Sequence, residues 1–387
     1  MSKKNVNRRS FFKLATAVGA GAIVSNSQSI LAAPPQEQKK VKPETNIADA
    51  LKYPRQKNSL PGMYPGKVVK IVDEQSVIDN KPQEDIAYEM IKKVLLQLTN
   101  ETNINKAWTH FVAQDEIIGL KVNPVAGKLL TTSHAVVKSI IKQLEEAGIP
   151  RKNIVIWDRR LMQLHETGYT SENYPGITIT GTEQQDEEGG FYDKDGILYG
   201  EKMIDKEWYY YADVNGEYDE YTIPYMVNGG KYSYFSKICT QQVDKIINVP
   251  ILKNAGPTAT LCLKNLAYGS ISNTGRLHKQ LWADTCAEVC AFPPIRDKVV
   301  LNIVDGLRGC YNGGPGANPQ FICNYYTIMA GTDPVAVDRI GHDIVVKKRI
   351  AEGIQEKDDP RRLKFMEMAE ELELGVADIS KITLENV

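Results

Sequence analysis

Strand-like and helix-like patterns of hydrophobic residues alternate along most of the chain. Short apolar runs predict strands over residues 67–72, 117–122, 153–157, 245–252 and 299–304. Apolar residues three and four positions apart predict helices over residues 83–98, 133–147, 277–290, 333–349 and 361–374. Strands separated by helices predict an α/β fold with a mainly parallel sheet and flanking helices.

The first 60 residues lack this alternation. Residues 1–33 contain five basic residues and no acidic one, and Arg8 and Arg9 precede a weakly apolar run over 14–24. This arrangement is typical of a twin-arginine signal peptide, so we expect recognition by the twin-arginine export machinery and a periplasmic location. Residues 34–60 are rich in Pro, Lys and Gln and predict a flexible linker, which leaves residues 61–387 as a single domain.

Composition places the chain among soluble globular proteins, with 42% hydrophobic and 25% charged residues. Six cysteines among 387 residues exclude a disulfide scaffold, and no apolar run approaches the roughly 20 residues of a membrane span. The net charge of −1 gives no reason to expect a nucleic-acid partner.

That charge is unevenly distributed. Residues 181–221 hold 13 acidic and 3 basic residues, whereas the rest of the chain after residue 33 is mildly basic. Asp195-Gly196 and Asn215-Gly216 lie between Tyr-rich runs in this segment and predict a β-hairpin insert. Such an insert covers a cleft, provides an acidic surface for a protein partner, or only decorates an edge of the domain.

Polar residues follow the predicted strands, where open parallel sheets bind their ligands. Lys264-Asn265 also interrupts a largely apolar stretch, where a charge is costly unless it is paired or faces a ligand. These positions are Lys121, Asn123, Asp158, Lys253, Lys264, Asn265 and Asp305. Together they predict a pocket in which the lysines hold a small anion, the asparagines orient it, and Asp305 or Asp158 acts as acid, base or metal ligand. Taken singly, an Asp after a strand is more often part of a turn or a helix cap, and a Lys there usually lies at a solvated edge.

Histidines and cysteines add one titratable residue and one open question. His278 follows the Lys264-Asn265 stretch and is the best candidate for proton transfer. Cys286 and Cys290 are four residues apart, which fits a buried thiol pair or half of a metal or cluster site, but no second pair follows. The sequence therefore leaves both the metal and the cofactor unknown. It contains no Walker loop, dinucleotide fingerprint or serine nucleophile elbow.

Several motifs in order resemble a known family. They are IGLKVNP at 118–124, IWDR at 156–159, INVPILK at 247–253, LKNL at 263–266, Gly269, Arg276, His278, VDG at 304–306 and TDPVAVDR at 332–339. On these the chain resembles the domain of unknown function 362 family, and in particular its twin-arginine-exported members, over about residues 65–385. Relatives fused to ferredoxin-type cluster domains imply redox or cofactor-linked chemistry by analogy. The family usually has a His where Asn254 stands here.

These observations favour an exported enzyme, which the resemblance would make redox or cofactor-linked, acting on a small anionic molecule. A periplasmic protein that binds a ligand or cofactor without catalysis is the alternative. The sequence does not distinguish the two, and it names neither the substrate nor the reaction.

Overall fold

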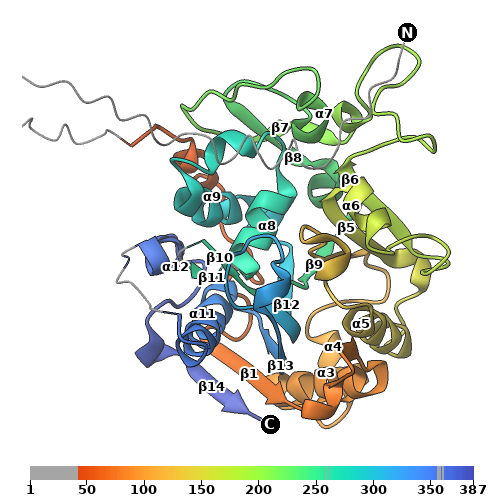
Figure 1. The fold of residues 1–387 in the computed structure, drawn as a ribbon, viewed down its shortest axis with the longest axis vertical. Coiled ribbons are helices and arrows are strands. Elements are labelled where there is room, and N and C mark those ends of the chain that lie inside the picture. Colours follow the sequence, from red (N-terminus) through yellow and green to blue (C-terminus); the bar gives the residue numbers. More distant parts are fainter. Residues whose placement is uncertain (1–41, 257, 260, 355–358, 360) are drawn as a thin grey trace, which may run out of the picture. The chain divides into compact units, whose positions relative to one another are not determined.

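The computed structural model describes residues 42–387 except 257, 260, 355–358 and 360 (Figure 1). The predicted signal peptide, residues 1–33, and the first part of the predicted linker lie outside the described residues. Among the helices that are described, none has the length and apolar character needed to cross a membrane.

The strands of the described chain run from β1 to β14. They are β1 Lys67–Val72, β2 Val77–Ile78, β3 Lys81–Pro82, β4 Ile118–Lys121, β5 Ile154–Arg160, β6 Thr178–Glu183, β7 Ile204–Tyr211, β8 Tyr232–Ser236, β9 Lys245–Asn248, β10 Ile251–Ala255, β11 Thr258–Ala259, β12 Val299–Cys310, β13 Ile322–Gly331 and β14 Thr383–Asn386.

The α-helices of the described chain run from α2 to α12. They are α2 Ile47–Leu51, α3 Glu84–Thr99, α4 Ile104–Thr109, α5 His134–Glu146, α6 Leu161–Glu166, α7 Ile223–Met226, α8 Cys262–Ser270, α9 Trp282–Glu288, α10 Pro293–Arg296, α11 Pro334–Ala351 and α12 Arg361–Glu371.

One large sheet has the order β14-β1-β13-β12-β9-β4-β5-β6, with β10 beside β12 and β11 beside β10. The ladders from β12 through β9, β4 and β5 to β6 are all parallel, and β13 runs antiparallel to both β1 and β12. Helices cover the sheet (Figure 1). The prediction of an α/β fold with a mainly parallel sheet is confirmed.

The predicted strand over 245–252 is two strands in the structure. β9 pairs with β4 on one side and β12 on the other, whereas β10 continues beside β12 after Val249-Pro250. Proline has no backbone N–H and cannot continue the ladder, so the break falls there. Residues after Pro250 therefore leave the line of β9 and carry Lys253 over the carboxyl edge of β4.

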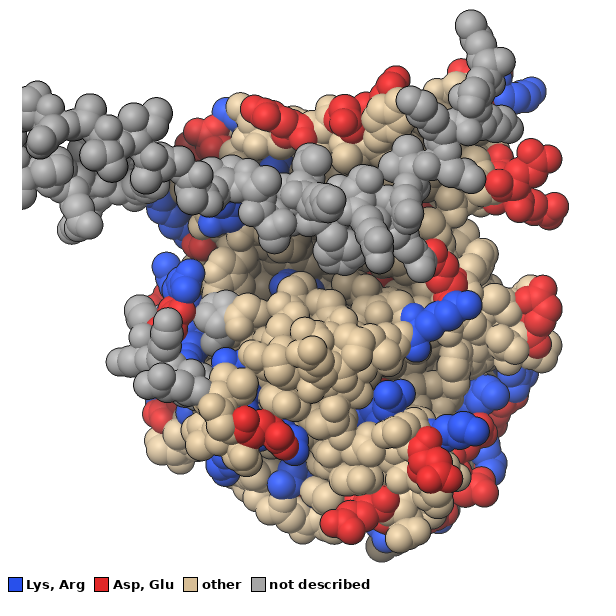
Figure 2. Space-filling model, in the orientation of Figure 1, with Lys and Arg blue, Asp and Glu red and all other residues tan. Residues whose placement is uncertain are grey.

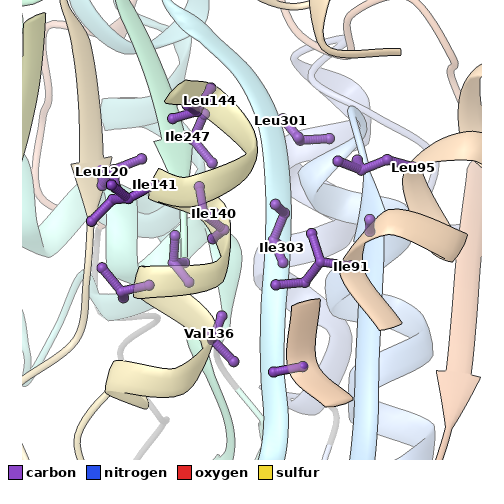
Figure 3. Packing of buried hydrophobic residues seen from close by; sticks show 14 of the residues in the cluster. Ile91, Leu95, Leu120, Val136, Ile140, Ile141, Leu144, Ile247, Leu301 and Ile303 are labelled. Atoms are coloured by element: carbon purple, nitrogen blue, oxygen red, sulfur yellow. The ribbon is translucent and has the colours of Figure 1, made fainter. Parts of the chain in front are cut away.

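Helices α3 and α5 pack on one face of the sheet (Figure 3). Ile91 and Leu95 of α3 and Ile140 of α5 point toward strand residues such as Leu120 and Ile303, and all five are closed to water. The spacing of three and four residues that predicted these helices places the apolar side chains on the face toward the sheet. α5 begins after Ser133, whose hydroxyl caps it by accepting from the N–H of Ala135 at 3.2 Å.

The other side of the sheet carries α8 and α9, which were only partly predicted. Leu263 and Leu266 of α8 and Cys286 of α9 share a second buried cluster with Ile246 and Trp157 from the strands. The predicted helix over 277–290 is a 3-10 turn at Gly275–Leu277, then α9, then a second 3-10 turn at Val289–Ala291. α8 therefore lies across the end of β4, close to Lys121.

The Tyr-rich hairpin is present as β7 and β8, which pair antiparallel. Tyr209 and Tyr232 pack edge to face across it, with 5.2 Å between ring centroids. Its second strand lies beyond residue 221, so Asn215-Gly216 belongs to a long connection over 212–231 instead of a two-residue turn. The insert therefore extends further along the chain than its acidic residues indicate.

Residues 42–60, the described part of the predicted linker, are folded against the domain. The backbone N–H of Asn46 donates to the carbonyl of Tyr211, and Ala50 and Leu60 are fully buried. Lys42 pairs with Asp284 at 2.5 Å and with Glu288 at 3.1 Å. The linker prediction did not anticipate this packing, because the apolar residues that anchor the segment, Ile47, Ala50, Tyr53 and Leu60, are scattered among polar ones without a regular spacing.

Candidate functional site

A buried ion pair lies at the carboxyl end of β4. Lys121 is the last residue of β4, and its ammonium group contacts the carboxylate of Asp158 on β5. The same ammonium donates to the backbone carbonyl of Val122 at 2.9 Å and to the amide oxygen of Asn265 at 3.1 Å. A lysine has three donors, so Lys121 has none left for a ligand. These contacts suit a positioning role, and the expectation that Lys121 itself binds the anion stays a prediction.

Four asparagines connect this ion pair to neighbouring strands in what we call the amide network: Asn123, Asn265, Asn248 and Asn302. The Asn265 oxygen accepts from Asn123 at 3.0 Å as well as from Lys121, and its amide donates to Asn248 at 2.8 Å. Asn248 donates in turn to Asn302 at 2.9 Å. Because each amide is oriented by its neighbours, the network fixes the positions of the polar groups at this edge of the sheet.

Lys253 on β10 reaches the network from the opposite side. Its amine donates to the Asn123 amide oxygen at 2.9 Å, and the residue is only 4% exposed. Within the described residues, no carboxylate lies within ion-pair distance of it. Burial, followed by the positive charge of nearby Lys264, lowers the pKa of Lys253 to about 8. The structure thus brings Lys121, Asn123, Asp158, Asn265 and Lys253 together.

Two further cations lie in this region, and we call Lys253, Lys264 and Arg159 the basic cluster. The charge of Lys264 acts on Lys253, and the charges of both Lys264 and Arg159 act on His278. The Lys264 amine lies 5.7 Å from the ring centroid of Tyr268 and, in the described chain, makes no hydrogen bond or ion pair. Arg159 donates to the hydroxyl of Thr274. Burial, and then the charge of Arg160, lowers the pKa of Arg159 to about 10, and burial also lowers that of Lys264. Figure 2 shows basic atoms inside a hollow on this face, at the height of α8 in Figure 1.

His278 lies at the edge of the basic cluster. Its ring packs on Tyr268 with 4.5 Å between centroids, and Nδ1 lies 3.0 Å from the carbonyl oxygen of Thr274. A carbonyl can only accept, so Nδ1 carries the proton and Nε2 keeps its lone pair. The residue as a whole is exposed, and partial burial of its ring, followed by the charges of Lys264 and Arg159, lowers the pKa of His278 to about 4. The ring is therefore neutral near pH 7.

The carboxylate of Asp305 is directed toward the start of α5. It accepts the backbone N–H of Ser133 at 2.6 Å, just before α5, and that of Leu307 at 3.1 Å. Burial raises the pKa of Asp305 to about 6. It lines a separate cavity of about 230 Å³ with His134 and Arg308. No described hydrogen bond or ion pair joins Asp305 to the basic cluster, and the role of Asp305 or Asp158 as acid, base or metal ligand stays a prediction.

Asn254, the position where the family usually has His, supports the turn after β10. Its amide donates to the carbonyls of Gly256 and Thr258, and its oxygen accepts the N–H of Gly314 at 3.2 Å. All of its described contacts are to backbone, and the residue is 3% exposed. Asn254 thus holds the segment that carries Lys253.

Cys286 and Cys290 are both buried free thiols. Burial raises the pKa of Cys286 to about 12 and that of Cys290 as well, which keeps both thiols protonated near pH 7. In the part of the chain that the structure describes, no group of three or more His, Cys, Asp or Glu residues is arranged to hold a metal. These surroundings agree with a buried thiol pair.

The insert is fastened to the loop that carries His278. Arg276 donates to the carbonyls of Ala212 and Val214 at 2.9 Å and to that of Lys231 at 2.7 Å. Its backbone N–H donates to the hydroxyl of Tyr218 at 3.0 Å. Figure 2 shows acidic side chains along the upper edge, where Figure 1 draws the green insert. Binding of a protein partner at that edge stays a prediction.

Sequence reasoning missed Arg159, Asn248 and Asn302. A signal was available for the two asparagines, because each interrupts a run of apolar residues that predicts a buried strand. Arg159 stands in a run of charged residues after 157, where the predicted strand ends. The structure instead continues β5 to Arg160, because the unpredicted strand β6 pairs with it.

The fold and the site define an α/β protein with a buried polar network at the carboxyl edge of its sheet. The chain belongs to the family described as domain of unknown function (DUF362), whose model matches residues 118–343. That range includes the whole amide network and the basic cluster.

Two further comparisons add little. No curated protein matches the chain. A crystal structure of a Thermotoga maritima protein, a structural genomics target, aligns with a TM-score of 0.33 and 8% identity. That alignment covers 69% of this chain and 59% of the other.

Proposed function

We propose that the chain is an enzyme that acts on a small anionic molecule bound at the basic cluster. The supporting observation is that Lys253 is buried and Lys264 and Arg159 are half-buried, while no carboxylate among the described residues lies within ion-pair distance of any of the three. Charges buried in this way are costly unless something compensates them. An anion bound between them would supply the missing charge.

The contacts divide the roles among the predicted residues. Lys253 and Lys264 hold the anion, and Asn123 and Asn265 orient the lysines instead of the ligand. The pair of Lys121 and Asp158 neutralises itself and supports the network.

The proton-transfer role goes to His278, since both oxygens of Asp305 already accept backbone N–H groups. A bound anion would offset the charges of Lys264 and Arg159 and raise the pKa of His278 from about 4 toward the neutral range. The Nε2 lone pair would then accept a proton more readily.

A panel of anions tests binding. We would measure the Tm of the mature chain at constant ionic strength with pyruvate, lactate, glyceraldehyde 3-phosphate, glycerol 3-phosphate and inorganic phosphate. A ligand at 100 times its Kd adds about 2.7 kcal/mol of stability, enough to raise Tm measurably. Lys264→Gln should weaken binding about tenfold or more, because it removes a charge-assisted contact. Lys152→Gln, at an exposed lysine, is the matched control.

Two results would end the proposal: no anion of the panel raises Tm, or Lys264→Gln binds as the parent chain does. Turnover separates the enzyme from the alternative, a non-catalytic ligand-binding or cofactor-binding protein. Retention of an unchanged anion under all conditions would favour the binding protein.

Export by the twin-arginine route is a separate proposal that rests on residues 1–33 alone. Replacing Arg8 and Arg9 together by lysine should leave the protein in the cytoplasm, as measured by fractionation of the producing cells. Unchanged appearance of the double variant in the periplasm would contradict it.

A further inference from the structure

The amine of Lys253 differs from an ordinary lysine amine in three ways. It is buried, it has Lys264 as a charged neighbour, and its described hydrogen bond goes to an amide oxygen. Burial and then the charge of Lys264 disfavour the ammonium form, and the pKa of Lys253 falls to about 8, because the Asn123 amide oxygen carries no charge that would offset them. Near pH 7 such an amine is unprotonated roughly 300 times more often than a lysine with the usual pKa. Only the unprotonated amine is a nucleophile.

The position of this amine is also fixed. Asn123 accepts from Lys253 through Oδ1 and donates to Asn265 through Nδ2 at 3.0 Å, and its backbone N–H donates to the hydroxyl oxygen of Thr132 at 2.8 Å. Its amide oxygen therefore cannot turn away from Lys253 without breaking other bonds. The acceptor holds one N–H of the amine and leaves the nitrogen lone pair directed elsewhere.

We propose that Lys253 is a nucleophile that forms an imine with a small anionic carbonyl compound, one that carries a carboxylate or phosphate near its carbonyl. This inference rests on the proposed anion site, because Lys264, the charged neighbour of Lys253, would hold the anionic group beside the amine.

The reaction needs no oxidant or reductant. The Lys253 nitrogen attacks the carbonyl carbon, a C–N bond forms, and the C–O π electrons move to oxygen, which takes a proton lost by the nitrogen. The carbinolamine then releases its hydroxyl, with a second proton, as water. Amine and carbonyl have become imine and water.

The other lysines of the site are less suited to this step. Lys121 uses its three donors on Val122, Asp158 and Asn265, and although burial lowers the pKa of Lys121, the carboxylate of Asp158 opposes that shift. The Lys264 amine lies over the ring of Tyr268, a contact that favours a cation. Lys253 combines burial, a like-charged neighbour and a neutral acceptor.

Borohydride trapping tests the proposal. The mature chain is incubated with pyruvate or glyceraldehyde 3-phosphate and sodium cyanoborohydride, and the adducts are mapped by peptide mass spectrometry. We expect a secondary amine at Lys253 that forms at least about tenfold faster than at exposed lysines such as Lys152. Lys253→Met should remove that adduct and leave slow surface labelling unchanged.

A second measurement does not depend on a folded variant. Lactate and glycerol 3-phosphate carry the same charged groups without the carbonyl, so each should slow labelling of Lys253 and leave that of Lys152 unchanged. Binding of these analogues without a Lys253 adduct from either carbonyl probe would overturn the imine and leave the anion site in place. Failure of all four compounds to raise Tm would overturn both.

Discussion

The ammonium group of Lys121 and the carboxylate of Asp158 form an ion pair that is almost closed to water, with side chains 0% and 5% exposed. Because Asp158 compensates the charge of Lys121, it is not available to pair with Lys253 and Lys264 at the same edge of the sheet. The excess positive charge of the site follows from this pairing.

Breaking this ion pair should destabilise the fold strongly. Asp158→Asn leaves the Lys121 ammonium buried without its counter-ion, a change that typically costs 3–5 kcal/mol. Denaturant unfolding measures the free energy directly. Glu352→Gln is the matched control, since it removes one partner of the half-exposed pair with Lys348, worth about 0.5 kcal/mol or less. An equally small loss in the free energy of unfolding for both variants would contradict the expectation that an unpaired Lys121 ammonium is costly to bury.

A carboxylate placed beside Lys253 should compensate its charge and weaken anion binding. Asn123→Asp keeps the shape of the side chain and puts a negative charge on the acceptor of Lys253. An opposite charge at this distance raises the pKa of a lysine by about 1–3 units, so the lysine stays protonated. The carboxylate then compensates its positive charge. We expect anion affinity to fall by a factor of ten or more in calorimetric titrations.

Asn318→Asp controls for added charge in that experiment, because Asn318 only caps a 3-10 turn and aspartate caps equally well. Circular dichroism would verify that both variants are folded. Undiminished affinity in Asn123→Asp would contradict the proposed place of the anion.

Gly269 on α8 lets Lys121 lie against the helix. A methyl group there would lie 2.6 Å from Lys121 Nζ and closer still to Cε. Helix propensity favours alanine over glycine by about 1 kcal/mol, so propensity alone predicts that Gly269→Ala stabilises the protein. We expect the overlap to prevail, with a net loss of about 1–3 kcal/mol in denaturant unfolding. Gly316→Ala, where a methyl group meets nothing within 4 Å, should change stability little; a stabilised Gly269→Ala would refute the close approach.

Anion binding should take up protons between about pH 8 and 9. Lys253, with a pKa of about 8, is partly unprotonated there, and a bound anion raises that pKa, so the complex holds more protons than the free protein. Affinity should therefore fall as pH rises above 8. Titration calorimetry in two buffers with different ionisation enthalpies gives the proton count, expected to be about half a proton at pH 8. Proton release, or affinity that rises with pH, would contradict the assignment.

The α/β fold could be predicted because its evidence is local. The apolar run at 117–122 and the spacing of apolar residues in 133–147 show which face of each element is buried. Such a pattern can be recognised within the element itself. The lengths of β5 and β12 could not be predicted, because they depend on pairing with β6 and β13, strands that the pattern did not show. Pairing partners are a property of the folded sheet.

The site was predictable in part for a similar reason. The rule that ligands bind beyond parallel strands brought Lys121, Asn123, Asp158 and Lys253 to one edge. It also placed Asp305 there, yet the direction of that side chain toward the start of α5 depends on the alternation along β12. Among the described residues, Lys253 and Lys264 have no carboxylate partner because Lys121 on β4 pairs with Asp158 on β5. The spacing of these residues along the chain does not show which lysine takes the carboxylate.

The pKa of the Lys253 amine, measured at Nζ, tests the proposed anion site most directly. The Nζ resonance, assigned with the help of Lys253→Met, can be followed by nitrogen NMR over pH, with and without saturating lactate. We expect a pKa of about 8 in the free protein and a rise of at least about one unit with lactate bound. An ordinary pKa near 10.5 that no anion of the panel changes would contradict the proposed site.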